Sequence, residues 1–153
     1  MIYVDLDGVL ADFNTWAGDN LTSNDQDAYM RMFITHYDEC FKTLKPIELG
    51  LDIIKTLDKY CILTAMPNHA EFISAGQELG YSVQELERRY DVMRNNKLHW
   101  VSKYIGEVPV IIVPSRKAKV NFAKGNVLID DYYKNIDDWN ASGGIGVLFN
   151  YTV

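Results

Sequence analysis

The chain has 153 residues, and its 15 Lys and Arg against 21 Asp and Glu give a net charge of −6 at pH 7. This length and a hydrophobic fraction of 48% fit one compact domain and exclude collagen-like, disordered and disulfide-scaffold classes. An acidic chain is also repelled by the phosphate backbone of long nucleic acid, which excludes extended nucleic-acid binding.

The first part of the chain begins with a short strand that opens into a loop. Residues 2–6 form a β-branched and aromatic run, which breaks at Gly8. Apolar side chains then recur at helical spacing. They predict helices at 9–19, 25–41 and 46–59, the last of which begins with Pro46.

The second part of the chain alternates strands with helices. Short, continuous apolar strands that alternate with helices are typical of a parallel sheet with helices on both faces. We therefore predict a Rossmann-like, three-layer α/β/α fold. In chain order, the predicted elements are a strand at 60–64, a helix ending near Leu79, a helix at 84–105, a strand at 108–113, a short helix at 117–124, and strands at 127–129 and 145–149.

We predict a single domain over residues 1–153. Its core comprises about residues 1–12 and 60–153, and the insert after the first strand, at about 13–59, forms a small helical cap. Cys40 and Cys61 are too few for a disulfide framework and are expected to be reduced thiols. The chain shows neither a signal-peptide pattern nor an apolar run of roughly 18 residues, so we expect a cytoplasmic protein without a membrane partner.

Polar side chains follow four of the predicted strands at the point where each strand ends. Asp5 and Asp7 follow the first strand, and Thr64 ends the second. The third strand is followed by a basic stretch that contains Lys117 and Lys119, and the fourth ends at Asp130-Asp131. Because ligands bind at the carboxyl ends of parallel strands, these side chains predict a site at one edge of the sheet.

Up to four carboxylates in a small space need a compensating cation, because neighbouring negative charges repel each other. Oxygen ligands without nearby His or Cys favour Mg²⁺ over zinc. Magnesium, a hydroxyl, a lysine and a spare carboxylate are what phosphoryl transfer requires. A carboxylate can itself be the nucleophile and form an aspartyl-phosphate.

The four strand ends resemble the four motifs of the haloacid dehalogenase-like hydrolases, in the family's order. Asp5-Leu6-Asp7-Gly8-Val9 is similar to the first motif, Thr64 to the second, a lysine at 117–119 to the third, and Ile129-Asp130-Asp131 to the fourth. The longer strings 5–13, 97–106 and 128–131 are similar to the 5'(3')-deoxyribonucleotidases of bacterial or phage type. The resemblance covers almost the whole chain.

The resemblance implies a role for each acid. Asp5 is expected to be the nucleophile, and Asp7 the general acid that protonates the leaving nucleoside oxygen and then activates water. Asp5, the backbone carbonyl of Asp7 and the carboxylate of Asp130 are expected to hold Mg²⁺. Asp131 is expected to support this metal site from outside its direct ligands.

The resemblance also implies contacts to the substrate. Thr64 is expected to donate a hydrogen bond to the phosphoryl group. A lysine is expected beside it, and both Lys119 and Lys117 fit the spacing, with Lys119 favoured by its distance from Asp130 along the chain. Phe13 matches an aromatic position that lies against the base in these nucleotidases.

We therefore expect a Mg²⁺-dependent phosphomonoesterase, a 5'(3')-deoxyribonucleotidase that hydrolyses nucleoside monophosphates through an aspartyl-phosphate. The alternatives are a related phosphatase for another small phosphate ester or an oligonucleotide end phosphate, and a non-catalytic nucleotide-binding member. The expected partner is a small phosphomonoester. A homodimer is one option for the oligomeric state, which the sequence leaves open.

Overall fold

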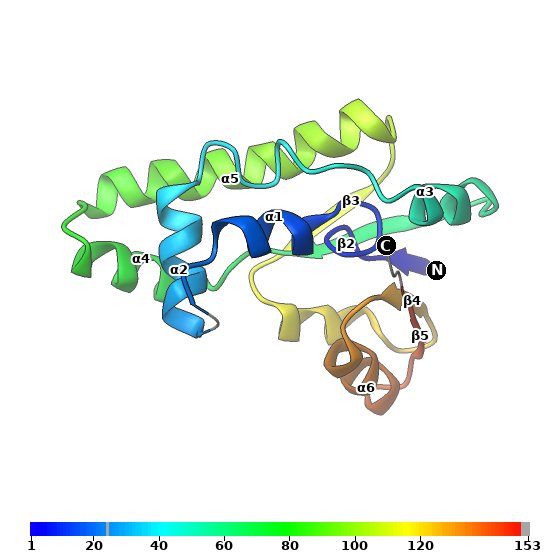
Figure 1. Ribbon diagram of the computed structural model, residues 1–153. Coiled ribbons are helices and arrows are strands. Elements are labelled where there is room, and N and C mark those ends of the chain that lie inside the picture. The colour runs from blue at the N-terminus through cyan, green and yellow to red at the C-terminus, as the bar shows by residue number, and fades with distance from the viewer. Residues whose placement is uncertain (24, 151–153) are drawn as a thin grey trace. The chain divides into compact units, whose positions relative to one another are not determined.

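The computed structural model describes residues 1–23 and 25–150, and a five-stranded sheet lies at its centre. All strand pairs are parallel, and the strands follow the order β3-β2-β1-β4-β5 across the sheet (Figure 1). The predicted Rossmann-like α/β class is therefore confirmed. The strands are β1 (Ile2–Val4), β2 (Cys61–Ala65), β3 (Val110–Val113), β4 (Val127–Asp130) and β5 (Ile145–Leu148).

The order of the strands reverses beside β1. The chain runs outward from β1 through β2 to β3, and then returns to place β4 on the other side of β1, with β5 beyond it. Val4 consequently pairs with Ile62 of β2 and with Ile129 of β4. Ligands of open parallel sheets bind at such a reversal. Asp5 directly follows β1 and Asp130 ends β4, so two of the predicted site residues lie at this point.

The chain divides into two compact units. The sheet unit comprises Met1–Asp12, Lys45–Met66 and the residues from Glu107 onward, and the helical unit comprises Phe13–Leu44 and Pro67–Gly106. The sheet unit contains α3 (Glu48–Lys55), the 3-10 helix η1 (Arg116–Phe122) and α6 (Tyr133–Ala141). The helical unit contains α1 (Phe13–Asn20), α2 (Gln26–Thr35), α4 (His69–Glu78) and α5 (Val83–Tyr104).

This division differs from the expected boundaries of core and cap. Residues 45–59, expected in the cap, group with the sheet, and residues 67–106, expected in the core, group with the helices. The first difference arises because two hydrogen bonds of 2.8 Å, from Ile47 N–H to the Leu10 carbonyl and from Asp12 N–H to the Lys45 carbonyl, join this segment to the loop after β1. Residue 24 of the expected cap and residues 151–153 of the expected core lie outside the described residues.

The second difference arises from side chains of α5 that hold the irregular segment 36–44. The side-chain amide of Asn96 lies 3.1–3.4 Å from three carbonyl oxygens of this segment, and the indole N–H of Trp100 donates to the Leu44 carbonyl at 2.8 Å. These carbonyls therefore have partners outside a helix. For that reason α2 ends at Thr35, whereas periodicity alone predicts a helix to residue 41.

The predicted helix at 9–19 begins later than expected, at Phe13. The residues before it form a tight loop instead, because the backbone N–H groups of Leu10 and Ala11 both donate to the Leu6 carbonyl, at 2.9 and 3.0 Å. The apolar side chains of Val9 and Leu10 are buried in this loop. Apolar side chains that are buried in a loop can therefore show the same spacing as those on one face of a helix.

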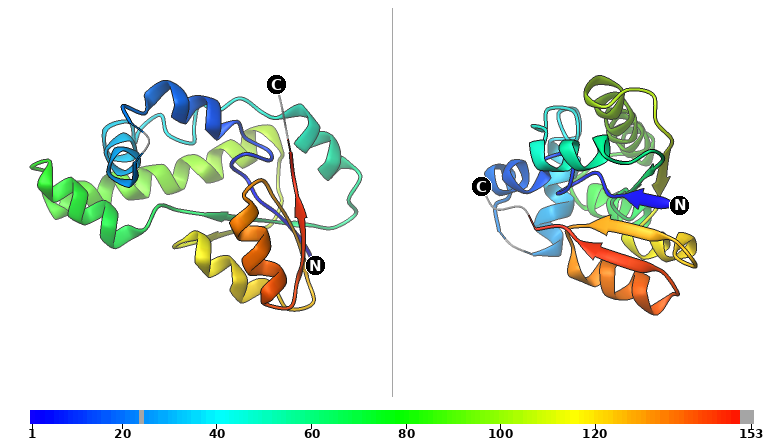
Figure 2. Two further views of the ribbon diagram at one scale, coloured as in Figure 1. Left: turned by 60° about the horizontal axis from the view of Figure 1, so that its bottom comes forward. Right: turned by 90° about the vertical axis from the view of Figure 1, so that its right-hand side faces the viewer.

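The core of the sheet unit fixes η1 and α6 against the strands β1 and β4. Leu128 of β4 is fully buried and clusters with Ile136 and Trp139 of α6, and Tyr3 and Phe122 pack against the same cluster. Figure 2 shows α6 (orange) beside the strands β4 and β5. Helix α6 is not among the predicted elements, and it follows directly on the acids at the end of β4.

Within the described parts of the chain, no helix is both long enough and apolar enough to cross a membrane. Helix α5 has 22 residues, but it carries charged side chains along its length.

Candidate active site

Asp5 and Asp7 are held by different parts of the backbone. The N–H of Asp5 donates to the Ile129 carbonyl of β4 at 2.9 Å, which continues the sheet by one residue. Asp7 lies on the tight loop that follows, in which Gly8 N–H donates to the Ala11 carbonyl at 2.8 Å. The carboxylate of Asp5 is therefore fixed relative to the strands, and that of Asp7 relative to the loop.

The loop after β1 is also held from outside. Helix α3 approaches it so closely that a side chain at Gly50 would overlap the carbonyl oxygen of Val9. Together with the hydrogen bond from Ile47 N–H to the Leu10 carbonyl, this contact holds the loop in place. The segment 45–50 thus positions Asp7.

Gly8 is a position that only glycine can occupy without strain. Its φ of +86° lies in the left-handed region, and a Cβ there would overlap the carboxylate of Asp131. The loop that carries Asp7 therefore lies directly against the residue that follows β4. Two separate strand ends are brought together at this contact.

Replacing Gly8 with alanine should displace the loop and Asp131 together. We expect a loss of about 2 kcal/mol of stability from the strained backbone. For the phosphomonoester hydrolysis that the sequence leads us to expect, we also predict about 10²-fold lower turnover, because a small misplacement of reacting groups is costly. Thermal unfolding and steady-state kinetics measure the two effects. The matched control is Gly18→Ala, because a Cβ at Gly18 meets no atom within 4 Å; equal turnover in the two variants would contradict this account of Gly8.

Lys119 connects the ends of β1 and β4. It lies on η1, its residue is only 3% exposed, and its Nζ donates to Oδ1 of Asp5 and to Oδ2 of Asp130, both at 2.9 Å. Lys117, the other lysine that fits the spacing, is exposed to solvent on the same short helix. Of the two candidates, Lys119 is the one that reaches the acids.

Asp130 is fully buried and is held by three donors among the described residues. Its Oδ1 accepts from the backbone N–H of Tyr132 at 2.9 Å, and its Oδ2 accepts from Lys119 and from the side-chain amide of Asn135 at 3.0 Å. Hydrogen bonds to both oxygens fix the rotation of the carboxylate.

Asp5, Asp130 and Asp131 form a close group of carboxylates. One oxygen from each lies within 4.8 Å of the other two. Asp131, expected to act from outside the direct metal ligands, is therefore near enough to be one of them. The Asp7 carboxylate is not a member of this group.

The buried ionisable groups of the site shift one another's pKa values. Burial raises the pKa of Asp5 well above its ordinary value, and the neighbouring charge of Asp130 raises it further, against the opposing effect of Lys119. Burial alone would lower the pKa of Lys119, but Asp5 and Asp130 raise it by more, so the ammonium stays charged. One ammonium thus faces three close carboxylates.

These residues fit a hard divalent cation. The three side chains offer only carboxylate oxygens, which suit Mg²⁺ and are poor ligands for softer metals. A cation would also relieve the repulsion that raises the pKa of Asp5. The chemistry of the donors and the close approach of three carboxylates therefore both favour a hard divalent cation.

The remaining predicted residues occupy two different units. Thr64 is fully buried near the carboxyl end of β2, where it pairs with Ile112 of β3. Phe13 begins α1 in the helical unit, and its ring lies 6.0 Å from that of Phe33 and 5.7 Å from that of Phe41. Thr64 thus shares the unit of the carboxylates, and Phe13 belongs to an aromatic cluster of the other unit.

Asn135 is a site residue that the sequence reasoning missed, because it lies on the unpredicted helix α6. A signal for that helix was present. Ile136 and Trp139 are three residues apart, as expected for one face of a helix, and they follow the acids at 130–131 after a short turn. A helix placed there would have brought Asn135 near the end of β4.

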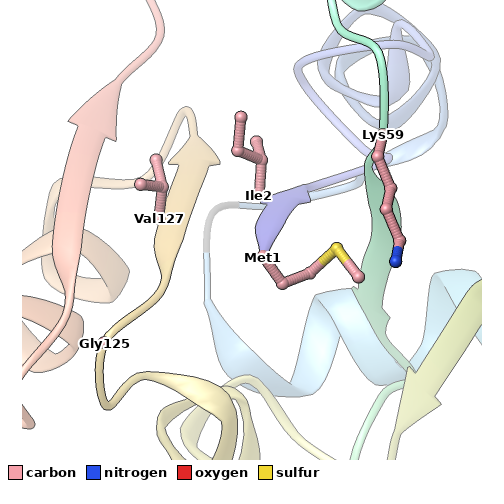
Figure 3. A pocket seen from close by; sticks show the side chains of 5 residues that line it. All are labelled: Met1, Ile2, Lys59, Gly125 and Val127. Carbon is pink, nitrogen blue, oxygen red and sulfur yellow. The ribbon is translucent and has the colours of Figure 1, made fainter.

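A hollow of about 300 Å³ lies at the opposite end of the strands, beside the amino ends of β1, β2 and β4 (Figure 3). Its lining includes Ile2 and Val127, the first residues of β1 and β4, and Lys59, which precedes β2. The group contains no carboxylate that could act as acid, base or metal ligand. The carboxyl ends of the strands, where the carboxylates lie, are therefore the better candidate for an active site.

In comparisons with known proteins, the chain matches no protein-family model and no curated protein. Its function has to be inferred from the residues of the site. A buried carboxylate next to a lysine can act as a nucleophile, and a second carboxylate on the adjoining loop can carry a proton. A cation held by the acidic group would stabilise developing negative charge.

Proposed function

We propose that the chain is a Mg²⁺-dependent phosphomonoesterase, a haloacid dehalogenase-like hydrolase of the 5'(3')-deoxyribonucleotidase type. One observation carries the proposal: buried Lys119 bridges Asp5 and Asp130 across the reversal of strand order. The sequence motifs predict this grouping from positions 114 residues apart in the chain. A salt bridge that served stability alone would gain nothing from a third carboxylate, Asp131, beside it.

The metal would be held by Asp5, Asp130 and the backbone carbonyl of Asp7, with Asp131 as a further ligand or as the partner of a bound water. Bound Mg²⁺ would neutralise charge on the nonbridging phosphoryl oxygens. Lys119 adds a fixed positive charge, and its hydrogen bond to Oδ1 of Asp5, together with that from Leu6 N–H, holds the nucleophile Asp5 in one rotamer.

The reaction takes place in two steps. In the first, a carboxylate oxygen of Asp5 forms a bond to phosphorus while the bond from phosphorus to the ester oxygen breaks, and Asp7 gives that oxygen its proton. In the second, Asp7 removes a proton from water, whose oxygen attacks the aspartyl-phosphate and releases inorganic phosphate from Asp5. The loop around Gly8 supports Asp7 in both steps.

The substrate class in this proposal is a nucleoside monophosphate. Thr64 would donate its hydroxyl to the phosphoryl group, and Phe13 would lie against the base. The flat, apolar surfaces of the aromatic cluster to which Phe13 belongs suit a planar ring. The buried thiols of Cys40 and Cys61 support action in a reducing compartment, which we take to be the cytoplasm.

A panel of phosphomonoesters tests this function. Deoxy- and ribonucleoside 5'- and 3'-monophosphates are compared with sugar phosphates and oligonucleotides that carry an end phosphate, each with Mg²⁺ and after exhaustive chelation. We expect nucleotides to be hydrolysed fastest, chelation to abolish turnover, and added Mg²⁺ to restore it. Activity that survives chelation would contradict the metal assignment. Nucleotide binding without any turnover would instead identify a non-catalytic member.

A further inference from the structure

A chain of hydrogen bonds leads from the surface of the sheet unit to Asp130. Arg116 of η1, whose side chain is 35% exposed, donates from Nη1 to Oδ2 of Asp138 at 3.3 Å and to Oδ1 of Asn135 at 3.2 Å. Asn135, nearly buried on α6, donates from Nδ2 to Oδ2 of Asp130 at 3.0 Å. Asn135 belongs to none of the motifs that predict the active site, and Arg116 enters them only as part of the basic stretch after the third strand.

Arg116 determines which way the Asn135 amide points. A guanidinium can only donate hydrogen bonds, so the amide must turn its oxygen toward Arg116 and its NH₂ group toward Asp130. The guanidinium is itself placed by Asp138 and lies 5.4 Å from the centre of the Tyr132 ring. The orientation of the buried amide is therefore set from the surface.

The amide in turn limits how Asp130 can move. A carboxylate has about four lone-pair positions, and three of those on Asp130 accept from Tyr132, Lys119 and Asn135. Asp5 and Asp131 repel Asp130, which favours a rotation away from them. The hydrogen bond from Asn135 opposes that rotation at the oxygen that Lys119 also contacts.

We propose that Asn135 is a positioning residue that holds the Asp130 carboxylate ready for a divalent cation, and that Arg116 orients the Asn135 amide for this task. This inference rests on the proposed function, because it assumes that the acidic group binds a metal. Hydrogen-bond partners of metal-binding carboxylates raise metal affinity by fixing ligand geometry. Here the partner is an uncharged donor, which adds no further charge to the group.

Helix α6 is attached to the sheet by contacts besides those of Asn135. Ile136 and Trp139 of this helix are buried in the apolar cluster with Leu128, and the indole N–H of Trp139 donates to the Asn126 carbonyl at 3.1 Å. Loss of the Asn135 amide should therefore leave the helix in place. Its effect should appear in metal affinity rather than in folding.

The experiment measures binding of Mn²⁺ to the full chain by electron paramagnetic resonance, with Mg²⁺ as competitor and without substrate. The variants are Asn135→Ala and Arg116→Gln, and the control is Asp137→Ala, an exposed residue of the same helix. We expect Asn135→Ala to weaken Mn²⁺ and Mg²⁺ binding about 10–100-fold and Arg116→Gln to weaken it by a smaller factor. The control should bind like the wild type. In the Asn135→Ala background, Arg116→Gln should have no further effect.

Kinetics provide a second readout. At saturating Mg²⁺, Asn135→Ala should recover most of the wild-type kcat and keep the KM for phosphomonoester. Only the Mg²⁺ concentration that is needed for activity should be higher. Wild-type affinity for Mn²⁺ in Asn135→Ala would overturn the inference and leave the proposed function standing. Weaker Mn²⁺ binding together with a wild type that hydrolyses no phosphomonoester would support the inference and contradict the proposed reaction. If the wild type binds neither Mn²⁺ nor Mg²⁺, both are overturned.

Circular dichroism checks that each variant is folded. If Asn135→Ala does not fold, Arg116→Gln decides the matter, because it changes a partly exposed side chain and leaves Asn135 in the core. Mn²⁺ binding by Arg116→Gln that equals that of the Asp137→Ala control then overturns the inference. Weaker binding supports it.

Discussion

Replacing Asp5 with asparagine should abolish turnover and raise the stability of the metal-free protein. Loss of a catalytic nucleophile commonly costs a factor of 10³ or more, and we expect a decrease of at least about 10³-fold in kcat. Stability should rise because the variant removes one of three close carboxylates. Asparagine can still accept the hydrogen bonds that Oδ1 of Asp5 receives from Leu6 N–H and from Lys119.

The pH dependence of unfolding provides an independent check on the same variant. Because burial and Asp130 raise the pKa of Asp5 in the folded state, the folded wild type binds more protons than the unfolded chain above a pH of about 4. The stability of the metal-free wild type should therefore fall as pH rises toward the folded-state pKa. That of Asp5→Asn should fall less over the same range.

Thermal unfolding with and without Mg²⁺ measures both effects. We expect a melting temperature a few degrees above that of the wild type without metal, and a smaller gain from added Mg²⁺ in the variant than in the wild type. An Asp5→Asn variant that keeps most of its activity would remove the nucleophile from the mechanism. One that is less stable than the wild type at neutral pH would contradict the proposed excess of negative charge.

Replacing Lys119 with methionine should have the opposite effect on stability and the same effect on turnover. Asp5 and Asp130 would lose their shared ammonium partner in a buried place, and removing one member of a buried ion pair costs about 3 kcal/mol or more. For a chain of this length, that corresponds to a melting temperature lower by roughly 6–12 °C. Turnover should fall by about 10³-fold, because the charge that faces the phosphoryl group in the proposed mechanism is lost.

Lys117→Met is the matched control for this variant. It makes the same change two residues away on η1, at an exposed position. We expect it to change stability by less than about 0.5 kcal/mol, as is usual for surface positions, and to leave turnover unaltered. Added Mg²⁺ should recover part of the stability lost in Lys119→Met. Equal effects of the two substitutions on unfolding and kinetics would show that Lys119 has no special place in the site.

The acids at the strand ends could be predicted from the sequence because each follows directly on a buried strand. Once the sheet is parallel and β1 lies beside β4, the positions of Asp5 and Asp130 follow from connectivity alone. The choice between Lys117 and Lys119 did not follow in this way. On a short 3-10 helix, residues two apart point in different directions, and only the placement of that helix against the sheet decides which lysine is buried.

The boundary between the two units could not be predicted because it depends on contacts far apart in the sequence. No pattern in residues 36–44 indicates that their carbonyl groups accept hydrogen bonds from side chains of α5, which lie more than fifty positions later in the chain. Similarly, the position of Asn135 beside Asp130 depends on the packing of α6 against the apolar cluster. Local periodicity predicts helices and strands. Long-range hydrogen bonds, such as that from the Asn96 amide to the Cys40 carbonyl, depend on tertiary packing.

The division of the chain into two discontinuous units constrains how new specificity could arise. The chain passes from one unit to the other after Asp12, Leu44, Met66 and Gly106, so the helical unit consists of two separate stretches. A recombination event that exchanges a single stretch would pair α1 and α2 with a foreign α5 and leave the carbonyls of 36–44 without their donors. Exchange of the whole unit requires both stretches at once. Substitution of single side chains elsewhere in the helical unit keeps these hydrogen bonds, whereas transfer of one stretch does not.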